Sequence, residues 1–519
     1  MRYVLGIDVG SGSARCGVFD GESTLIGVGK HPIAQHRPET DHVEQSSENI
    51  WSAICTAVAE ALAAAQVDGA DVTALSYSAT CSLVLLDKEH NPLPLSTTDT
   101  PWNIIMWMDH RATAETDEVN ATGSSVLRNL GGAISVEMEI PKLMWVKRNR
   151  PEIWDQLGYA GDLADFLCFK STGTFERSAC TLGCKWTFDP DAGGWNTDFL
   201  RAAGLDDLLE RAALPPNATP IGAGVGSLTE AAARDLGLTT SCSVGMGLID
   251  AHAGALGTSG LHETGIDQRL ALIAGTSNCH IALTKRRTEV AGVWGPYAGA
   301  VLEGWYALEG GQSATGAALD QILGMFRAPI DKPHQTLGQA FLDGLQADPE
   351  YGSEICVLPD FLGNRSPFAD PSMRGAILGL SLENLETMLP KLYGATALGI
   401  AFGTRQIIDA MRSAGLPIKA IDLSGGHVKS DLLVQLYADA TGCDLFLPAC
   451  EEPVLLGAAC AAAKATAENS TFHRTAANAP ARLIKPNPRR STNLQTRYER
   501  FSKHYPKLER QPVTIAKAL

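Results

Sequence analysis

Residues 3–31 read YVLGIDVGSGSARCGVFDGESTLIGVGKH, and this stretch decides how the rest of the chain is interpreted. Three apolar segments are separated by two turns rich in Gly, Ser and Asp. This alternation predicts three consecutive antiparallel strands joined by tight turns. Asp8 stands just before the first turn, although a buried strand has no use for a carboxylate at its end. We expect Asp8 either to have a chemical role or to cap the turn through its own backbone.

The segments that follow predict helices and strands packed on this sheet. Apolar residues recur every four positions from Ile50 to Leu62 behind a Ser-Ser start, which indicates an amphipathic helix. A strand is expected over residues 72–78 and a hairpin over residues 83–95. The first half of the chain is therefore of the α/β class.

A second sheet is expected after about residue 247. Residues 270–284, LALIAGTSNCHIALT, again place a strand, a turn of small residues and a second strand in succession. Gly275-Thr276 then corresponds to Gly10-Ser11, which suggests that one domain was duplicated. The elements expected later are a helix over 392–414, a strand over 420–426, a helix over 429–442, a strand over 444–448, and a surface helix with a tail after about 466.

The composition of the 519-residue chain describes a globular protein with material for more than one core. Its hydrophobic content is 45%, its charged content is 19% and its mean hydropathy is -0.01. This length exceeds what one core usually supports, so we expect two large domains. The formal net charge of -16 argues against nucleic acid and anionic membranes as partners, because both are bound by clusters of Lys and Arg.

Cysteine usage and the N-terminus indicate a cytoplasmic protein. The 12 cysteines contain no CxxC pair, and several lie in apolar surroundings, as Cys55 and Cys460 do. This usage predicts reduced, buried thiols. Asp8 interrupts the apolar stretch that a signal peptide needs, and no stretch of about 20 residues is apolar enough to span a bilayer. The basic final segment either is a solvated face or binds phosphate.

The two turns of small residues are candidate phosphate-binding loops. Such turns expose successive backbone N–H groups, which can wrap a phosphate even in an acidic protein. Two of them facing each other would hold a polyphosphate, although either turn can simply reverse the chain. The sequence has neither GxxxxGK[ST] nor GxGxxG after a strand, which argues against a P-loop or a Rossmann site. Asp8, just ahead of Gly10, is placed to hold Mg²⁺ on such phosphates.

A second acid stands in residues 245–257, GMGLIDAHAGALG, a nearly apolar run. An unpaired charge is costly in such surroundings, so Asp250 predicts a cleft where the two halves meet. A carboxylate there is suited to accept a proton from a hydroxyl that attacks phosphorus. His252 is an alternative base, or else a structural hydrogen-bond donor.

Two glycine pairs precede segments that predict helices. Gly310-Gly311 is followed by Ser313, and Gly425-Gly426 is followed by Ser430. A helix N-terminus favours anions, and glycine lets a flat base lie against the backbone. Nucleotide binding and simple helix capping are both open at each pair.

Taken together, these residues resemble the FGGY carbohydrate kinases. The matching blocks, in the family's order, are IDVGSGSAR, PWNIIMWMDHRA, PKLMWVKRNRPE, GLIDAHAG, IAGTSNCHI, LEGGQSATG and LSGGHVKSDLLVQLYADATG. The blocks ATCSLVLLD, WMDHRA, CTLGCKWTF and FLGNRSPFADP are most similar to ribulokinases. The resemblance implies an α/β fold of two ribonuclease-H-like domains, as in the actin/hexokinase superfamily, around a central cleft. It implies a sugar-binding domain over 1–248, an ATP-binding domain over 249–465 and a C-terminal helix and tail over 466–519.

The resemblance also implies roles for individual residues. Asp250 matches the catalytic base, and Asp8 and Asp250 match the acids near Mg²⁺. The ATP contacts it implies are Gly10, Ser11, Ser13, Gly275, Thr276, Gly311, Gly425, Gly426 and Ser430. The sugar contacts it implies are Thr80, Cys81, Trp107, Asp109, Lys185 and Glu309.

Two departures from the family bear on the substrate. Ser11-Gly12 replaces the Thr-Thr of many relatives, which should loosen side-chain contacts to phosphate but spare backbone contacts. Thr80-Cys81 replaces the residues typical of glycerol kinases and xylulokinases, which argues against those substrates. We expect ATP-dependent phosphorylation of D-ribulose to D-ribulose 5-phosphate, with L-ribulose or ribitol as alternative acceptors. A sugar sensor, or an ATPase of the same fold without a sugar acceptor, is the rival from another class. The family includes homodimers, but no block here marks an interface.

Overall fold

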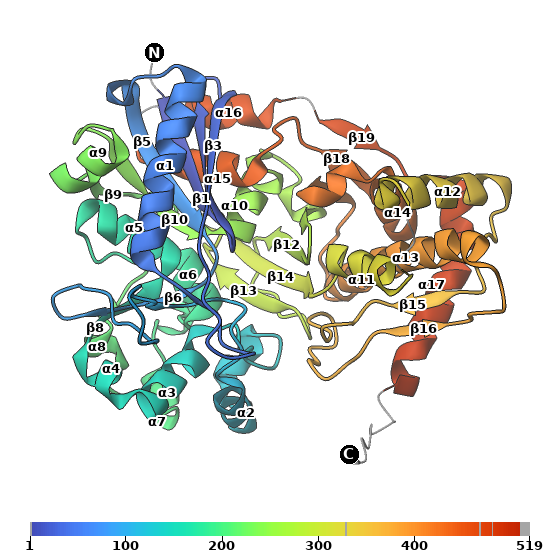
Figure 1. Cartoon of the computed structure of the whole chain (residues 1–519), viewed down its shortest axis with the longest axis horizontal. Coiled ribbons are helices and arrows are strands. Elements are labelled where there is room, and N and C mark those ends of the chain that lie inside the picture. Colours follow the sequence, from blue (N-terminus) through green and yellow to red (C-terminus); the bar gives the residue numbers. More distant parts are fainter. Residues whose placement is uncertain (1–2, 327–329, 467–468, 480, 509–519) are drawn as a thin grey trace.

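The structure is a computed structural model that describes all residues except 1–2, 327–329, 467–468, 480 and 509–519. Two large mixed sheets lie at the centres of two domains, and a smaller lobe is attached to the first of them (Figure 1). The expected α/β class with two domains is confirmed.

The first sheet has the strand order β3-β2-β1-β5-β10-β9. As predicted from residues 3–31, β1, β2 and β3 are consecutive antiparallel strands. β5 and β10 then run parallel to β1, with Val9, Ala79 and Ile249 side by side at the ends of the three strands. The strands are β1 (Tyr3–Val9), β2 (Ser13–Phe19), β3 (Leu25–Pro32), β5 (Val72–Ala79), β9 (Gly224–Ser227) and β10 (Ser243–Ile249).

The second sheet repeats this arrangement in the order β13-β14-β12-β11-β17-β18-β19. β11, β12 and β14 are antiparallel neighbours, and β17 and β18 run parallel to β11. The succession of antiparallel and parallel strands therefore matches that of the first sheet, as a duplicated domain requires. The strands are β11 (Arg269–Ala274), β12 (Asn278–Thr284), β13 (Trp294–Ala298), β14 (Tyr306–Gln312), β17 (Ala420–Ser424), β18 (Asp444–Leu447) and β19 (Arg482–Ile484).

The predicted amphipathic helix is α1 (Ser47–Ala65), which covers one face of the first sheet. Ser46 caps it by accepting a hydrogen bond from the Asn49 N–H. The apolar stripe from Ile50 to Leu62 is buried. Gly29 in β3 lets the helix approach closely, since a Cβ there would lie 2.0 Å from the Ala57 carbonyl oxygen. The four-residue period thus becomes the packing face of the helix.

Two short helices lie between the sheets and touch each other. α10 (Asp250–Leu256) follows β10 directly, and α15 (Pro453–Lys464) comes from the distant end of the chain. A Cβ on Gly457 would lie 1.9 Å from the Ala253 oxygen, and a Cβ on Gly257 would lie 2.0 Å from the Pro453 oxygen. α15 also packs on the first sheet, where a Cβ on Gly6 would lie 2.0 Å from the Leu455 oxygen. The position of α10 therefore depends on backbone contact with α15.

The smaller lobe holds a sheet with the order β4-β7-β6-β8. The hairpin expected over residues 83–95 forms in part: the Asp87 N–H donates to the Asn91 oxygen at 2.9 Å and the Leu93 N–H to the Leu85 oxygen at 3.1 Å. Its second arm is an isolated Leu86–Pro92 bridge and not a strand, and β6 pairs with β7 and β8. These partners come from remote segments that local turn signals do not reveal. The elements of the lobe are β4 (Glu44–Gln45), β6 (Leu83–Asp87), β7 (Ile104–Ile105), β8 (Leu157–Asp162), α2 (Thr113–Ala121), α3 (Glu139–Asn149), α4 (Pro151–Gln156), α6 (Ala179–Lys185), α7 (Thr197–Ala202) and α8 (Leu208–Arg211). Two further helices, α5 (Leu163–Thr172) and α9 (Glu230–Leu236), pack in the core of the first sheet instead.

One predicted helix start is wrong. Gly310 and Gly311 lie inside β14, which ends at Gln312, and the next helix begins only at Gly316. The reason is that β14 pairs with β12 along its whole length, so the two glycines sit in a sheet instead of opening a helix. The other pair lies before a helix, because Gly426 starts a 3₁₀ turn and Ser430 caps α14 (Asp431–Thr441).

The C-terminal segment is more than the predicted surface helix and tail. α17 (Pro488–Leu508) buries Leu494 and Phe501, and the Phe501 ring lies 5.3 Å from that of Phe402. Arg490 also forms a 2.6 Å ion pair with the buried Asp439. The predicted tail over 509–519 lies outside the described residues. The other elements of this domain are α11 (Gly316–Phe326), α12 (Pro333–Ala347), α13 (Leu385–Ser413), α16 (Asn469–Ala477), β15 (Cys356–Leu358) and β16 (Ala376–Leu378).

The predictions for thiols and for membrane-spanning helices can also be compared with the fold. All 12 cysteines are free, and eight of them are buried, as the sequence predicts. Within the described ranges, no helix has both the length and the apolar character needed to cross a bilayer.

Candidate active site

The carboxyl ends of β1, β5 and β10 bring three predicted site residues to one edge of the first sheet. Because Val9, Ala79 and Ile249 are neighbours in register, the residues just beyond them, Gly10, Thr80 and Asp250, emerge together. Ligands of α/β sheets commonly bind at such an edge. Strands from three distant parts of the sequence thus form one candidate site.

Asp8 is almost fully buried near the end of β1 and is held from two sides. Its Oδ2 accepts hydrogen bonds from Nε and Nη2 of Arg15 at 3.1 and 2.6 Å, and its Oδ1 accepts one of 2.9 Å from the Ser78 hydroxyl. Arg15 reaches further to Glu452, at 2.7 Å. The carboxylate is therefore fixed by side chains, not by the turn-capping bond that was its alternative interpretation.

Asp250 is the first residue of α10 and is only partly exposed. Its Oδ1 accepts a 2.6 Å hydrogen bond from the Ala251 N–H. Burial, and then the negative charge of Asp8, raise the pKa of Asp250 to about 6. Glu309 and Lys185 also act on it, in opposite directions. A carboxyl with such a pKa is well matched to proton transfer near neutral pH.

The first small-residue turn is anchored through its carbonyl groups. The Gly10 N–H donates to the Ser13 oxygen at 3.1 Å, which closes the turn. The Ser11 carbonyl accepts hydrogen bonds from the side-chain amides of Gln35 and Gln45 at 2.8 and 2.9 Å. The Ser11 hydroxyl accepts a 2.9 Å hydrogen bond from the indole of Trp107. Trp107, predicted to contact sugar, therefore also positions the predicted phosphate loop.

The second small-residue turn is tied to the start of α11. The Gly275 carbonyl accepts hydrogen bonds from the Thr315 hydroxyl and the Gly316 N–H, both at 2.9 Å, and the Thr276 carbonyl accepts one from the Thr315 N–H. Gly425 lies against the same turn, because a Cβ there would lie 2.4 Å from the Ala274 oxygen. Its φ of +86° is also one that glycine adopts without strain.

Four predicted ATP residues belong to this half of the site in different ways. Gly425 and Gly426 are exposed at the end of β17, beside the Gly275 turn. The Ser430 hydroxyl accepts a 3.3 Å hydrogen bond from the Leu433 N–H, as a helix cap. Gly311 packs against a side chain, since a Cβ there would lie 2.3 Å from Cδ of Arg365. The predicted ATP contacts of all these residues stay predictions.

A set of buried charges faces the same space from the lobe and the second domain. The Lys185 ammonium lies 4.6 Å and the Arg365 guanidinium 4.5 Å from the ring centroid of Trp294. Burial would raise the pKa of Glu309, but Lys185, His252 and Arg365 together hold it below its usual value. Glu309 is thus a buried carboxylate stabilised by two cations.

Three other predicted sugar residues differ in their surroundings. Thr80 and Cys81 are nearly buried just beyond β5, and the Thr80 hydroxyl lies 3.0 Å from that of Ser82. Asp109 is fully buried, where it accepts hydrogen bonds from the Val43 N–H and from the guanidinium of Arg111. Asp109 therefore supports the lobe, and its predicted contact with sugar stays a prediction.

Known proteins similar to this chain identify its family. Models of the N-terminal and C-terminal domains of the FGGY family of carbohydrate kinases match residues 3–257 and 270–466. An FGGY carbohydrate kinase domain-containing protein of Danio rerio is 39% identical, with 97% of each chain covered. The chain belongs to the FGGY family of carbohydrate kinases. It is accordingly an ATP-dependent sugar kinase that acts on a small-molecule acceptor.

Two further similarities bear on this FGGY kinase. A D-ribulokinase of Saccharomyces cerevisiae is 35% identical, over 98% of this chain and 77% of its own. The crystal structure of a xylulose kinase from Rhodospirillum rubrum has a TM-score of 0.83 at 22% identity, covering 98% of this chain and 99% of its own. The second similarity shows the fold alone.

Sequence reasoning missed three residues of the site in this FGGY kinase. Arg15 stands in the opening stretch, and a basic residue two positions after the turn was the available signal for a partner of Asp8. Arg365 lies in the block FLGNRSPFADP, where it had no assigned role. Trp294 carries no local signal, because only the folded chain brings its ring beside Lys185 and Arg365.

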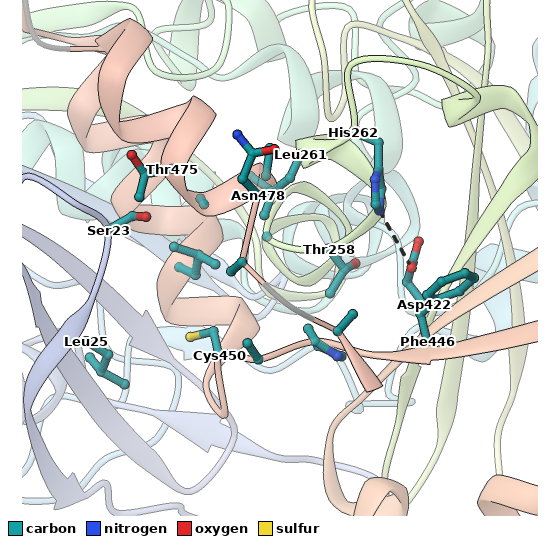
Figure 2. A pocket seen from close by; sticks show the side chains of 18 of the residues that line it. Ser23, Leu25, Thr258, Leu261, His262, Asp422, Phe446, Cys450, Thr475 and Asn478 are labelled. Atoms are coloured by element: carbon teal, nitrogen blue, oxygen red, sulfur yellow. Dashed lines mark ion pairs between the residues drawn. The ribbon is translucent and has the colours of Figure 1, made fainter. Parts of the chain in front are cut away.

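A cavity of about 610 Å³ lies away from these residues. Figure 2 shows it beside Ser23 of the β2–β3 turn, Leu25 at the start of β3, Cys450, and the Asp422–His262 pair, whose atoms are 3.8 Å apart. Asp422 and Arg269 lie away from the Gly275 turn, toward the other end of the second sheet. The cavity is therefore separate from the candidate active site.

Proposed function

We propose that this FGGY kinase transfers the γ-phosphoryl group of ATP to the terminal hydroxyl of D-ribulose, forming D-ribulose 5-phosphate and ADP. The observation that carries the proposal is the convergence of Asp250 with Lys185 and Glu309, whose charges act on its carboxylate. A base and polar groups for an uncharged polyol thus share one buried space. The 35% identity to a D-ribulokinase over 98% of this chain supports D-ribulose as the acceptor.

Asp250 accepts the proton of the terminal hydroxyl as that oxygen attacks the γ-phosphorus and the bond to the β-phosphate oxygen breaks. The proton ends on Asp250, the phosphoryl group ends on the sugar, and ADP leaves with the bridging oxygen. A carboxylate with a pKa of about 6 is ionised at neutral pH and still basic enough for this transfer. The N–H groups of the Gly10 and Gly275 turns hold the phosphates.

Asp8 and Asp250 fit a magnesium ion that arrives with ATP. The charge of Asp8 is one cause of the raised pKa of Asp250, so the two acids repel each other and a hard cation would relieve this repulsion. Carboxylates and phosphate oxygens are the ligands that Mg²⁺ prefers. When bound, the ion neutralises phosphate charge, while Arg15 keeps Asp8 in position.

Lys185 and Glu309 orient the sugar in this proposal. Lys185 can only donate hydrogen bonds, and Glu309 as a carboxylate can only accept them. A sugar hydroxyl can do both, so one hydroxyl fits between them. Glu309 Oε2 has no hydrogen-bond partner among the described residues, which leaves an acceptor for substrate.

The test is ADP release by the purified protein with ATP and Mg²⁺ across a panel of acceptors. The panel contains D-ribulose, L-ribulose, D-xylulose, L-xylulose, ribitol, L-arabinitol and glycerol, with a control lacking sugar. We expect the highest kcat/KM for D-ribulose. A preference for L-ribulose or ribitol would keep the kinase and reject the proposed acceptor, whereas sugar-independent hydrolysis would favour an ATPase.

A further inference from the structure

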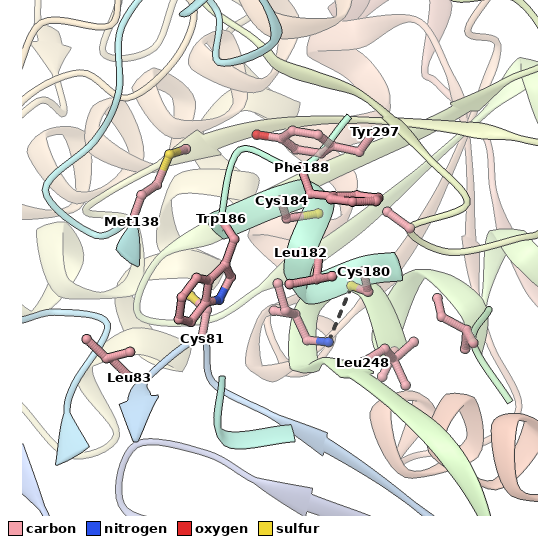
Figure 3. Close-up of a cluster of buried hydrophobic side chains, with 14 of the residues drawn as sticks. Cys81, Leu83, Met138, Cys180, Leu182, Cys184, Trp186, Phe188, Leu248 and Tyr297 are labelled. Carbon is pink, nitrogen blue, oxygen red and sulfur yellow. Dashed lines mark hydrogen bonds between the residues drawn. The ribbon is translucent and has the colours of Figure 1, made fainter. Parts of the chain in front are cut away.

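A cluster of two thiols and an imidazole lies between α6 and α10. Cys180 and Cys184 are one turn apart on α6, and His252 is on the first turn of α10. Their Sγ and ring nitrogen atoms all lie within 4.8 Å of one another, and all three residues are buried. Figure 3 shows both cysteines on the same helix, beneath Phe188 and Tyr297. None of the three has a part in the proposed phosphoryl transfer.

The distances in this cluster suit a tetrahedral metal site. The Cys184 Sγ lies 3.4 Å from Nε2 of His252. Bond lengths of about 2.3 Å for Zn–S and about 2.0 Å for Zn–N put such atoms about 3.5 Å apart in a tetrahedral site. The two atoms are therefore separated as two ligands of one metal ion would be.

An unpartnered carboxylate oxygen provides independent support. Oε2 of Glu309 is buried without a hydrogen-bond partner in the described chain, and it lies 4.0 Å from Nε2 of His252. Within the described residues, Nε2 of His252 has the Cys184 thiol as its hydrogen-bond partner, and a metal ion bound by both atoms would replace that contact. Buried polar atoms are rarely left unsatisfied, and each such atom suggests a ligand or a role.

We propose that Cys180, Cys184 and His252, with Glu309 as the fourth ligand, form a binding site for a thiophilic divalent cation such as Zn²⁺. Two sulfurs, one imidazole nitrogen and one carboxylate oxygen make a ligand set that Zn²⁺ accepts. The Ile249 N–H already donates a 3.5 Å hydrogen bond to the Cys180 Sγ, the kind of contact that stabilises a thiolate.

The charge balance of binding is favourable. As the two metal–sulfur bonds form, each thiol loses its proton to solvent. Before binding, the four groups carry the single negative charge of Glu309, and afterwards a dication, two thiolates and one carboxylate again sum to one negative charge. The net charge buried beside Lys185 is unchanged, so exchanging two protons for the cation avoids the cost of burying additional charge.

Occupancy would act on the active site through Glu309. If the proposed function holds, the metal takes the carboxylate oxygen that otherwise accepts a sugar hydroxyl. Zn²⁺ would then raise the KM for sugar without displacing ATP. This consequence depends on the proposed function, whereas binding of the metal itself does not.

The test is titration of the purified full-length protein with Co²⁺, a spectroscopic probe for Zn²⁺ sites, followed by competition with Zn²⁺. We expect one Co²⁺ per chain, with thiolate charge-transfer bands and the visible bands of a tetrahedral site, both abolished by Zn²⁺. Cys180→Ser and Cys184→Ser should each weaken binding by about 100-fold or more, since each removes a direct ligand. Circular dichroism confirms that each variant is folded.

The matched control is Cys450→Ser, which removes a partly exposed thiol outside the cluster and should leave the spectrum unchanged. Absence of thiolate bands in the wild type, or equal binding by wild type and both cluster variants, would overturn the proposal. His252→Asn gives a second test that leaves both thiols in place, and retention of tetrahedral bands in this folded variant would remove His252 from the site. Because the readout is spectroscopic, loss of the signal is independent of whether D-ribulose is the substrate.

Discussion

At the scale of single residues, the chemistry depends on the carboxyl group of Asp250. Asp250→Asn keeps the size of the side chain but removes its ability to accept a proton. We expect kcat to fall by about 10²–10⁴-fold, the range for loss of a general base, with ATP affinity retained. Measurement of kcat and of ATP binding by calorimetry checks this. Asp198→Asn, an exposed acid on α7, is the control; if Asp250→Asn retains more than a few per cent of the turnover, Asp250 is not the base.

The same residue predicts a pH dependence with a definite sign. The pKa of Asp250 is raised to about 6 by burial and by Asp8, and only the ionised form accepts a proton. We therefore expect kcat/KM to be level above pH 6 and to fall about tenfold per unit below it. Lys185 lowers this pKa, so Lys185→Met should move the acidic limb to higher pH, whereas Lys147→Met on α3 should not.

The contribution of Asp250 to folding stability should change with pH in the direction opposite to kcat/KM. A folded pKa above the unfolded value means that the folded state binds the proton more tightly, so the contribution of Asp250 to stability increases as pH falls from 6 toward 4. Above pH 6 the ionised carboxyl is a cost that Asp250→Asn removes. We expect this variant to melt at a higher temperature than the wild type at pH 8. Equal melting temperatures at pH 8 would show that the folded structure does not raise this pKa.

At the scale of elements, the contact between α10 and α15 holds Asp250 in place. A Cβ at Gly457 would lie 1.9 Å from the Ala253 oxygen, so Gly457→Ala must push the two helices apart. Overpacking of this kind costs about 1–3 kcal/mol, and displacement of α10 should also lower kcat. Gly324→Ala on α11 is the matched control, because nothing lies within 4 Å of its Cβ and the change should be neutral or stabilising. The measurements are the melting temperature and kcat of both variants. Equal values for Gly457→Ala and Gly324→Ala would contradict the predicted clash.

The elements also show why only part of the structure could be predicted from the sequence. The strands of residues 3–31 and the helix α1 were correct because alternation, turn residues and a four-residue apolar period are local signals. Gly310-Gly311 was misassigned because glycine pairs occur at helix starts and in strands alike, and only pairing with β12 settles the choice. The candidate site divides in the same way. The turns at Gly10 and Gly275 are visible locally, whereas the cations around Trp294 come together only through folding.

At the scale of the whole molecule, two sheets of the same topology present two small-residue turns to one site. The first domain adds Asp8 and Asp250, the lobe adds Lys185, and the second sheet adds Glu309. Any relative motion of the two halves therefore changes the distance between the base and the groups proposed to hold sugar. Contacts that bridge the halves should accordingly affect sugar binding, even where they lie outside the site.

One such bridge is formed by Arg287, which follows β12. It pairs with Asp189 at 2.7 Å and Asp191 at 2.9 Å, both from the segment after α6. Partly exposed ion pairs contribute about 0.5 kcal/mol each, so loss of both would change the balance of closed and open forms about fivefold. We therefore expect Arg287→Ala to raise the KM for sugar by up to about fivefold, with little change in kcat, and to enlarge the radius of gyration measured by X-ray scattering.

The control is Arg201→Ala, which removes an exposed pair within α7 and should change neither the KM for sugar nor the radius of gyration. Because Arg287 contacts none of the residues assigned to sugar or ATP, an increase in KM would have to act through closure, and an unchanged KM with an unchanged radius would show that this bridge does not control it.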